Sequence, residues 1–320
     1  MASSESSKTV FLAMSVNFSI GVAKSIIATI TMSSAMFSEA VHSFVDTGNQ
    51  FLLWFGIKQA KKSNPKIYPL GRGREEYFWT LVVAVLIFTI GGLVSLEHGI
   101  ESLSHPKKLE NLSISLTLLI VSIILESYVL KKAISELKRG KAKNKGILKL
   151  LKESTDGPLI AIVVEDFAAT LGLIFALVGT VLSFITQNSV YDSISAISIG
   201  ILLMVSGIFL GYEMKHLITG ESISNEKLKK IKQLISSNEQ VLNLSNLKIL
   251  PIGSNQYLAL INLDYRDSLK DEEIITVNSS LINSIKNSEP SISEIYFNPQ
   301  KDIIILWKLI KTICRKSKFK

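Results

Sequence analysis

The chain has very few of the side chains that enzymes and disulfide-bonded proteins rely on. Among its 320 residues there is one cysteine, Cys314, and only four histidines. A single cysteine excludes a disulfide within the chain and a thiolate metal cluster within the chain. The sequence also lacks a phosphate-binding Walker loop, a dinucleotide fingerprint and a nucleophile–base motif. These absences argue against an enzyme, against a bound organic cofactor and against a function driven by ATP.

Charge is scarce as well, and the little that is present is unevenly spread. Charged residues make up 19% of the chain and hydrophobic residues 47%, and the mean hydropathy is +0.34. These values are typical of a membrane protein that carries a soluble part. The formal net charge is +8, but in the first half of the chain most basic residues lie between apolar runs. We interpret this charge as a signal of membrane topology and not of nucleic-acid binding.

Six apolar segments have about the 20 residues that a helix needs to cross a bilayer. They predict an all-α bundle of six transmembrane helices within residues 1–219, surrounded by membrane lipid. The predicted segments are Val10–Ile30, Ala35–Ile57, Phe78–Ile100, Leu112–Leu130, Pro158–Ile185 and Ile194–Tyr212.

The connections between these segments alternate in charge. Residues 58–74 and 131–152 are rich in lysine and arginine, whereas the opposite side has only Lys107 and Lys108. Positive charge marks the inner side of a membrane protein. We therefore expect the N-terminus, both basic loops and everything after Tyr212 to be cytoplasmic, in an integral protein of the cytoplasmic membrane. The first eight residues are short, polar and free of arginine, which disfavours a cleaved transit peptide.

Residues 220–300 have the composition of a soluble domain. Helical and alternating patterns predict the order α-β-β-α-β, a small two-layer α+β domain. The predicted elements are a helix at Asn225–Asn238, a strand at Leu244–Leu250, a turn at Pro251–Ser254, a strand at 257–263, a helix at Glu272–Lys286 and a strand at Ile292–Phe297. Residues 301–320 combine apolar and basic side chains and predict an amphipathic tail that lies on the membrane or on a partner.

The second apolar segment carries three ionisable side chains on one stripe. Glu39, His42 and Asp46 stand at i, i+3 and i+7, so they share an arc of roughly 60° on a helix. A charged group in a bilayer core costs about 3 to more than 10 kcal/mol, so such residues face a cavity or a partner and mark ion paths. A histidine four residues before an aspartate also offers nitrogen and oxygen to one point, which predicts a pair of metal ligands.

The fifth segment carries two adjacent carboxylates, Glu165 and Asp166. Asp166 is eight residues from Pro158, so it lies roughly 12 Å from the cytoplasmic end of the helix and roughly 18 Å from the outer end of the core. Asp46 reaches a matching depth on the second segment. Just before the fifth segment, Asp156 is expected to cap the helix, with Pro158 in its first turn.

Three further charged positions have competing explanations. Lys24 lies about 9 Å inside the outer end of the first segment, and we predict that it pairs with Glu39 at a similar depth. Glu126 is either a vestibule residue or a solvated helix terminus. His98 is either an interfacial residue or part of an exit site.

A set of short motifs resembles the cation diffusion facilitator family, and within it the zinc transporter nine branch. The motifs are Asn17 with Lys24, the stretch Ser34–Ser43, the stretch Asp46–Gln50, Tyr68–Gly71, Val164–Asp166 with Gly172, and Tyr191–Ser193. The resemblance implies six transmembrane helices, a cytoplasmic ferredoxin-like domain and a homodimer. It also implies that a divalent cation, usually zinc, is exported from the cytoplasm by alternating access in exchange for protons.

The resemblance further implies four metal ligands, two from the second helix and two from the fifth. His42 and Asp46 match the first pair, and Asp166 matches one member of the second pair. Ile162 departs from the family pattern, because it occupies the place of the ligand four residues before Asp166. The candidates for the fourth ligand are Glu165, Glu39 or water.

Metal identity and activity remain open at this point. Imidazole suits zinc, whereas a site with one histidine and several carboxylates could also accept Mn(II), Fe(II) or Co(II). A membrane scaffold that keeps the family fold without transport is the alternative that Ile162 motivates. A passive channel is disfavoured, because charged ligands grouped at one depth would bind an ion rather than pass it.

The soluble domain has no histidine, and the chain's only cysteine lies beyond it. We therefore expect this domain to bind no metal tightly and to act in dimer contact.

Overall fold

The protein is described by a computed structural model that covers residues 2–62, 64–105, 112–139 and 146–299. Two compact units are present, Met1–Thr219 and Gly220–Lys320, and each is described by itself. The predicted amphipathic tail at 301–320 lies outside the described residues.

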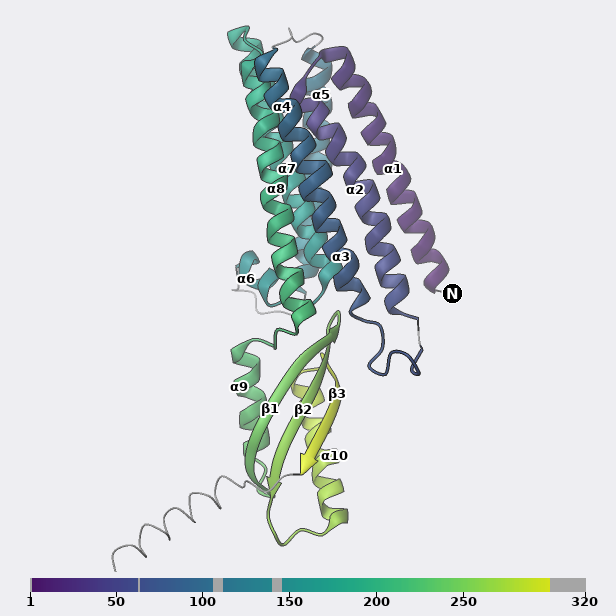
Figure 1. The fold of residues 1–320 in the computed structure, drawn as a ribbon, viewed down its shortest axis with the longest axis vertical. Coiled ribbons are helices and arrows are strands. Elements are labelled where there is room, and N and C mark those ends of the chain that lie inside the picture. Colours follow the sequence, from purple (N-terminus) through teal and green to yellow (C-terminus); the bar gives the residue numbers. More distant parts are fainter. Residues whose placement is uncertain (1, 63, 106–111, 140–145, 300–320) are drawn as a thin grey trace, which may run out of the picture. The chain divides into compact units, whose positions relative to one another are not determined.

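The first unit is a bundle of long helices (Figure 1). Its elements are α1 (Ala2–Thr31), α2 (Ser34–Ala60), α3 (Glu75–Leu86), η1 (Ile87–Leu93), α4 (Val94–Ser104), α5 (Leu112–Lys138), α6 (Ile147–Lys152), α7 (Gly157–Thr186) and α8 (Val190–Thr219). The π-helical η1 joins α3 and α4 into one continuous rod. Each of the six predicted segments therefore falls within one long helical rod.

Four of these rods are long and apolar enough to cross a membrane, judged over the described residues. They are Glu75–Ser104, Ser113–Lys138, Gly157–Thr186 and Val190–Thr219. This result agrees with the predicted bundle of long apolar helices. α1 and α2 occupy the places of the first two predicted segments, and their spanning of the membrane stays a prediction.

Local hydrogen bonds explain where α2 and α7 begin. The Ser33 hydroxyl accepts a hydrogen bond from the Met36 amide, so Ser33 caps α2. At α7, the Asp156 carboxylate accepts from the Leu159 amide at 3.0 Å, and Pro158 lies in the first turn. Both arrangements satisfy amides that have no partner within the helix. The predicted Asp156 cap is confirmed.

Glycines let the η1 region approach α8 closely. A methyl group on Gly200 would lie 2.6 Å from the Leu96 amide nitrogen, and one on Gly92 would lie 3.0 Å from the Met204 amide nitrogen. Small residues at such crossings allow two backbones to touch. The third rod and α8 are thereby packed backbone against backbone.

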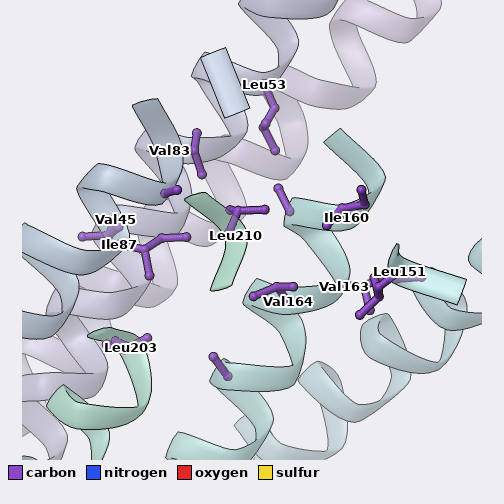
Figure 2. Packing of buried hydrophobic residues seen from close by; sticks show 14 of the residues in the cluster. Val45, Leu53, Val83, Ile87, Leu151, Ile160, Val163, Val164, Leu203 and Leu210 are labelled. Atoms are coloured by element: carbon purple, nitrogen blue, oxygen red, sulfur yellow. The ribbon is translucent and has the colours of Figure 1, made fainter. Parts of the chain in front are cut away.

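Figure 2 shows how apolar side chains fill the space between α2, α3, α7 and α8. Val45 and Leu53 come from α2, and Val164 comes from α7. Val45 and Val164 each directly adjoin an acidic residue, Asp46 and Glu165. Both acidic residues therefore border an apolar core, where an unpaired polar group is costly.

The second unit has the order α-β-β-α-β, as predicted. Its elements are α9 (Asn225–Ser236), β1 (Val241–Gly253), β2 (Gln256–Tyr265), α10 (Asp271–Ser288) and β3 (Ile292–Pro299). The sheet order is β1-β2-β3, with β1 and β2 antiparallel and β2 and β3 parallel. Tyr257, Ala259, Ile261 and Leu263 of β2 are all buried in the unit's own core, as their alternation predicted.

The predicted turn at Pro251–Ser254 is wrong by about two residues. β1 continues to Gly253, and Pro251 pairs with Tyr257 across the ladder. Proline is tolerated there because β1 is an edge strand of the described sheet. The chain reverses instead at Asn255, whose φ of 54° is a left-handed conformation that asparagine adopts more readily than most residues.

Candidate functional site

The polar stripe predicted on α2 is buried inside the bundle and is one residue longer than the sequence analysis recognised. Glu39 and His42 are buried, Asp46 is half-buried, and Asn49 continues the same face as a fully buried side chain. α2 packs against α1, α3, α7 and α8. The stripe therefore faces other helices and not the surroundings of the bundle.

Several atoms of this stripe have no hydrogen-bond partner among the described residues. They are both ring nitrogens of His42 and one oxygen each of Glu39, Asp46 and Asn49. His42 Nδ1 lies 3.4 Å from Asp46 Oδ1, which is within ion-pair range, but the geometry does not form a hydrogen bond. A nitrogen and an oxygen donor are thus brought together on one helix face, as predicted, and both remain available.

Lys24 of α1 pairs with Glu39, as predicted. Lys24 Nζ donates to Glu39 Oε2 at 3.1 Å, and the two side chains are only 2% and 1% exposed. The other side of Glu39 is closed by α7, since a methyl group on Gly172 would lie 2.9 Å from Glu39 Oε1. Lys24 therefore balances the charge of Glu39, and the close approach of α7 fixes the position of its side chain.

Glu165 of α7 is buried and bonded to α2. Its Oε1 accepts a hydrogen bond of 2.9 Å from Asn49 Nδ2. Asp166 is half-buried and keeps one buried oxygen without a hydrogen-bond partner among the described residues. Asp46 interacts electrostatically with both Glu165 and Asp166. Asp46 of α2 and the two adjacent carboxylates of α7 thus lie within electrostatic range of each other.

The candidate metal ligands do not lie around one common point. Across the residues that the structure describes, no three side chains of histidine, cysteine, aspartate or glutamate lie close enough to hold one metal ion. The structure brings His42 to Asp46, but it does not bring Asp166 or Glu165 into a common coordination sphere with them.

Glu126 of α5 belongs to the same electrostatic cluster. It is half-buried and interacts with Asp46, Asp166 and His42. α5 continues for three more turns beyond Glu126, to Lys138, so its alternative explanation as a helix terminus is wrong.

Asn49 and the packing of Glu126 are the two features that sequence reasoning missed. Asn49 stands three residues after Asp46 and ten after Glu39, so the spacing of the stripe contained the signal. The burial of Glu126 depends on α5 packing against α7, and no local pattern carries that information.

A second polar region lies where α2 begins. Asp192 of α8 accepts hydrogen bonds from the Ser33 hydroxyl at 2.7 Å and from the Ser34 and Ala35 amides at 2.6 and 3.2 Å. A cavity of about 210 Å³ adjoins it and is also lined by His98. These three hydrogen bonds fasten the start of α2 to α8.

Comparison with known proteins identifies the family of the helical bundle. A family model described as the cation efflux transmembrane domain matches residues 10–217. The mouse protein named proton-coupled zinc antiporter SLC30A9, mitochondrial, is 36% identical over 239 residues, and the human protein of the same name is 34% identical. Metal tolerance protein C4 of Arabidopsis thaliana is 26% identical over 238 residues.

These alignments cover 74% of this chain, but only 42% of the mouse and human proteins and 52% of the plant protein. The chain thus spans about half the length of the curated relatives it matches, or less. The matched region contains the helical bundle with all the site residues described above. The chain is an integral membrane protein and belongs to the cation efflux family, the cation diffusion facilitators.

Proposed function

We propose that this protein is a secondary transporter that moves a divalent cation, with zinc as the first choice, out of the cytoplasm in exchange for protons. His42, Asp46 and Asp166 supply three of the metal ligands, and Glu165 supplies the fourth. Glu39 is left out of this set because Lys24 already balances its charge. The names of the mouse and human relatives state proton coupling and zinc, and they support the same choice here.

The observation that carries the proposal is a set of buried nitrogen and oxygen atoms on α2 and α7 that could bind a metal and have no hydrogen-bond partner among the described residues. An unsatisfied buried polar atom costs about 1–3 kcal/mol, and native proteins contain few of them. Among the described residues, His42 has two, and Asp46 and Asp166 have one each. If these were unrelated polar packing residues, each unsatisfied atom would need its own explanation. A shared cation explains all of them.

Proton exchange follows from the identity of the ligands. A metal ion needs a neutral imidazole and ionised carboxylates, so its binding displaces any protons that these groups hold. Histidine is the side chain whose charge changes most readily over the physiological pH range. Metal and protons therefore compete for the same atoms, and protonation from the other side favours release of the metal.

Transport also requires movement between α2 and α7. In the described conformation the four proposed ligands do not converge, so side chains of the two helices must come closer when the cation binds. A site shared between two helices links cation binding to their relative position, as alternating access requires.

We place the protein in the cytoplasmic membrane, with six spanning helices formed by α1, α2, the α3–η1–α4 rod, α5, α7 and α8. The basic loops and the second unit then lie on the cytoplasmic side, and the second unit is a ferredoxin-like domain that contributes to a homodimer. In intact cells, a membrane-impermeant maleimide should not label Cys314, whereas a cysteine placed at Ser104 should be labelled. The reverse labelling pattern would mean that the protein has the opposite orientation in the membrane.

Zinc is the first choice of metal, because the proposed set contains an imidazole nitrogen. Three carboxylates make the same set acceptable to Mn(II), Fe(II) or Co(II). Competition between these metals in one transport assay decides among them.

A non-transporting scaffold remains the second candidate, and the observation that favours it is Ile162. Its side chain is apolar and 36% exposed, so it adds no ligand to the site. A scaffold that retained the family fold would show no metal flux.

The test is zinc uptake into proteoliposomes under an imposed pH gradient. Wild-type protein should show saturable uptake that collapses when the gradient is removed, whereas a channel would conduct without proton counterflow. Asp46→Ala and Asp166→Ala should each abolish uptake and leave the protein folded, while Asp271→Ala, an exposed residue of the second unit, should not change it. Near wild-type flux in a folded Asp46→Ala, Asp166→Ala double variant would overturn this site.

A further inference from the structure

We infer that Asn49 is a positioning residue of the transport site, which holds Glu165 in place as the second carboxylate that α7 contributes. This inference rests on the proposed transport function and deepens it. It explains how the site manages without a ligand at position 162.

The first support is the contact itself. Asn49 Nδ2 donates to Glu165 Oε1 at 2.9 Å across the α2–α7 interface. Asn49 is 0% exposed and Glu165 is 6% exposed, so water does not compete for this bond. A buried hydrogen bond to a carboxylate fixes the orientation of that carboxylate.

The second support is the position of the pair. Asn49 lies one turn after Asp46 on the same face of α2, and Glu165 directly precedes Asp166 on α7. The hydrogen bond therefore joins the two helices at the level of their proposed ligands. Ile162, by contrast, is apolar and partly exposed.

The third support is electrostatic and separates Glu165 from Glu39. Both are buried carboxylates, but Glu39 is bonded to the cation of Lys24, whereas Glu165 is bonded to a neutral amide. The Lys24 ammonium lies 3.1 Å from the Glu39 carboxylate, so it offsets most of the attraction of Glu39 for a second cation. Asn49 orients Glu165 without cancelling its charge, so Glu165 stays attractive to a metal ion.

The fourth support is the other half of the amide. Asn49 Oδ1 is buried and has no hydrogen-bond partner among the described residues. A side chain present only to fill the core would be replaced by an apolar one at no loss. The spare oxygen can instead accept a hydrogen bond, for example from a water molecule bound to the metal.

The test compares Asn49→Leu with wild-type protein in zinc uptake driven by a pH gradient. Leucine has a similar volume but cannot donate a hydrogen bond. Partners that orient metal ligands typically change metal affinity by about 10–100-fold when mutated. We expect the KM for zinc to rise by about that factor, with the maximal rate changed by no more than about twofold. Calorimetry with zinc on the purified protein should show a matching loss of affinity.

Gln50→Leu is the matched control. It removes an amide from the next position of α2, which points roughly 100° away from the stripe. Its KM should equal that of the wild type. If Asn49→Leu does not yield a monodisperse protein, Asn49→Ser replaces it, because the serine hydroxyl is too short to span the contact and should give the same rise in KM.

A second variant distinguishes positioning from packing. Glu165→Gln keeps an oxygen that can accept from Asn49 but loses the charge, so zinc affinity should fall. Adding Asn49→Leu to Glu165→Gln should then produce no further loss, since the ligand that Asn49 positions is already gone.

Two results would overturn the inference. One is a wild-type KM in Asn49→Leu, and the other is an equal, independent loss when Asn49→Leu is added to Glu165→Gln. Failure of the proposed function looks different, because the wild-type protein itself would then show no gradient-driven zinc uptake.

Discussion

Removing one member of the Lys24–Glu39 pair should destabilise the protein far more than removing both. The pair joins α1 to α2, with an N–O distance of 3.1 Å and side chains that are 2% and 1% exposed. The perturbations are Lys24→Met, Glu39→Gln and the double variant. Each replacement is close to the natural side chain in size, so the experiment changes charge and leaves the packing nearly intact.

The magnitude follows from two opposing terms. At an effective dielectric constant of about 20, charges 3.1 Å apart attract by about 5 kcal/mol, while burial of each ion costs several kcal/mol. The intact pair is therefore close to balance. A single substitution leaves one buried charge without its partner, which costs about 3–5 kcal/mol, whereas the double variant recovers most of that loss.

Thermal unfolding of the purified protein in detergent measures the effect. At roughly 2–4 °C per kcal/mol for a domain of this size, each single variant should melt about 6–20 °C below the wild type, with the double variant well above the worse single one. The control is the exposed pair Arg139 and Glu136, whose side chains are 79% and 56% exposed and which should contribute less than about 1 kcal/mol. A double variant no more stable than the worse single variant would refute the reasoning.

Two further predictions concern metal selectivity and the second unit. His42→Asp should retain transport but weaken the preference for zinc over manganese, because it replaces the only nitrogen ligand by oxygen; an unchanged ratio of zinc to manganese flux would contradict this. The second unit, which has its own core and no histidine, should bind no metal tightly, and sub-micromolar zinc binding in calorimetry on residues 220–300 would contradict that.

The order of helices and strands could be predicted because each has a strong local signal. The apolar runs located six helical rods, and the alternation of Tyr257, Ala259, Ile261 and Leu263 located β2. The boundary errors have local causes as well. Proline was expected to end β1, yet Pro251 sits on an edge strand where its missing N–H is tolerated.

The candidate site was predictable where one helix carried it and not where two helices met. The spacing of His42 and Asp46 on one helix face predicts their proximity from sequence alone. In the structure, His42 Nδ1 lies 3.4 Å from Asp46 Oδ1. The Lys24–Glu39 pair was also predictable, because depth in the bilayer can be counted along each helix. The Asn49–Glu165 bond joins residues 116 positions apart and depends on how α2 and α7 are rotated, which no single-helix pattern specifies.

Substitutions at Glu39 and at His42 should change the stability of the protein in opposite directions. This contrast tests whether His42 is kept for function. The charge of Glu39 is balanced by Lys24, so substitution of Glu39 leaves the buried Lys24 charge without its partner. His42 is 2% exposed, and neither ring nitrogen has a hydrogen-bond partner among the described residues. Replacing such a group by an apolar one of similar size removes about 1–3 kcal/mol of unsatisfied polarity per atom.

We therefore expect His42→Leu to melt at or above the wild-type temperature while it loses zinc transport. Residues kept for function often lower the stability of a protein, so their replacement can raise it. Glu39→Gln, one turn away on the same face, should show a clear drop in melting temperature. A drop of equal size in His42→Leu would mean that the imidazole is a structural residue of the core, and the proposed ligand set would then lose its only nitrogen donor.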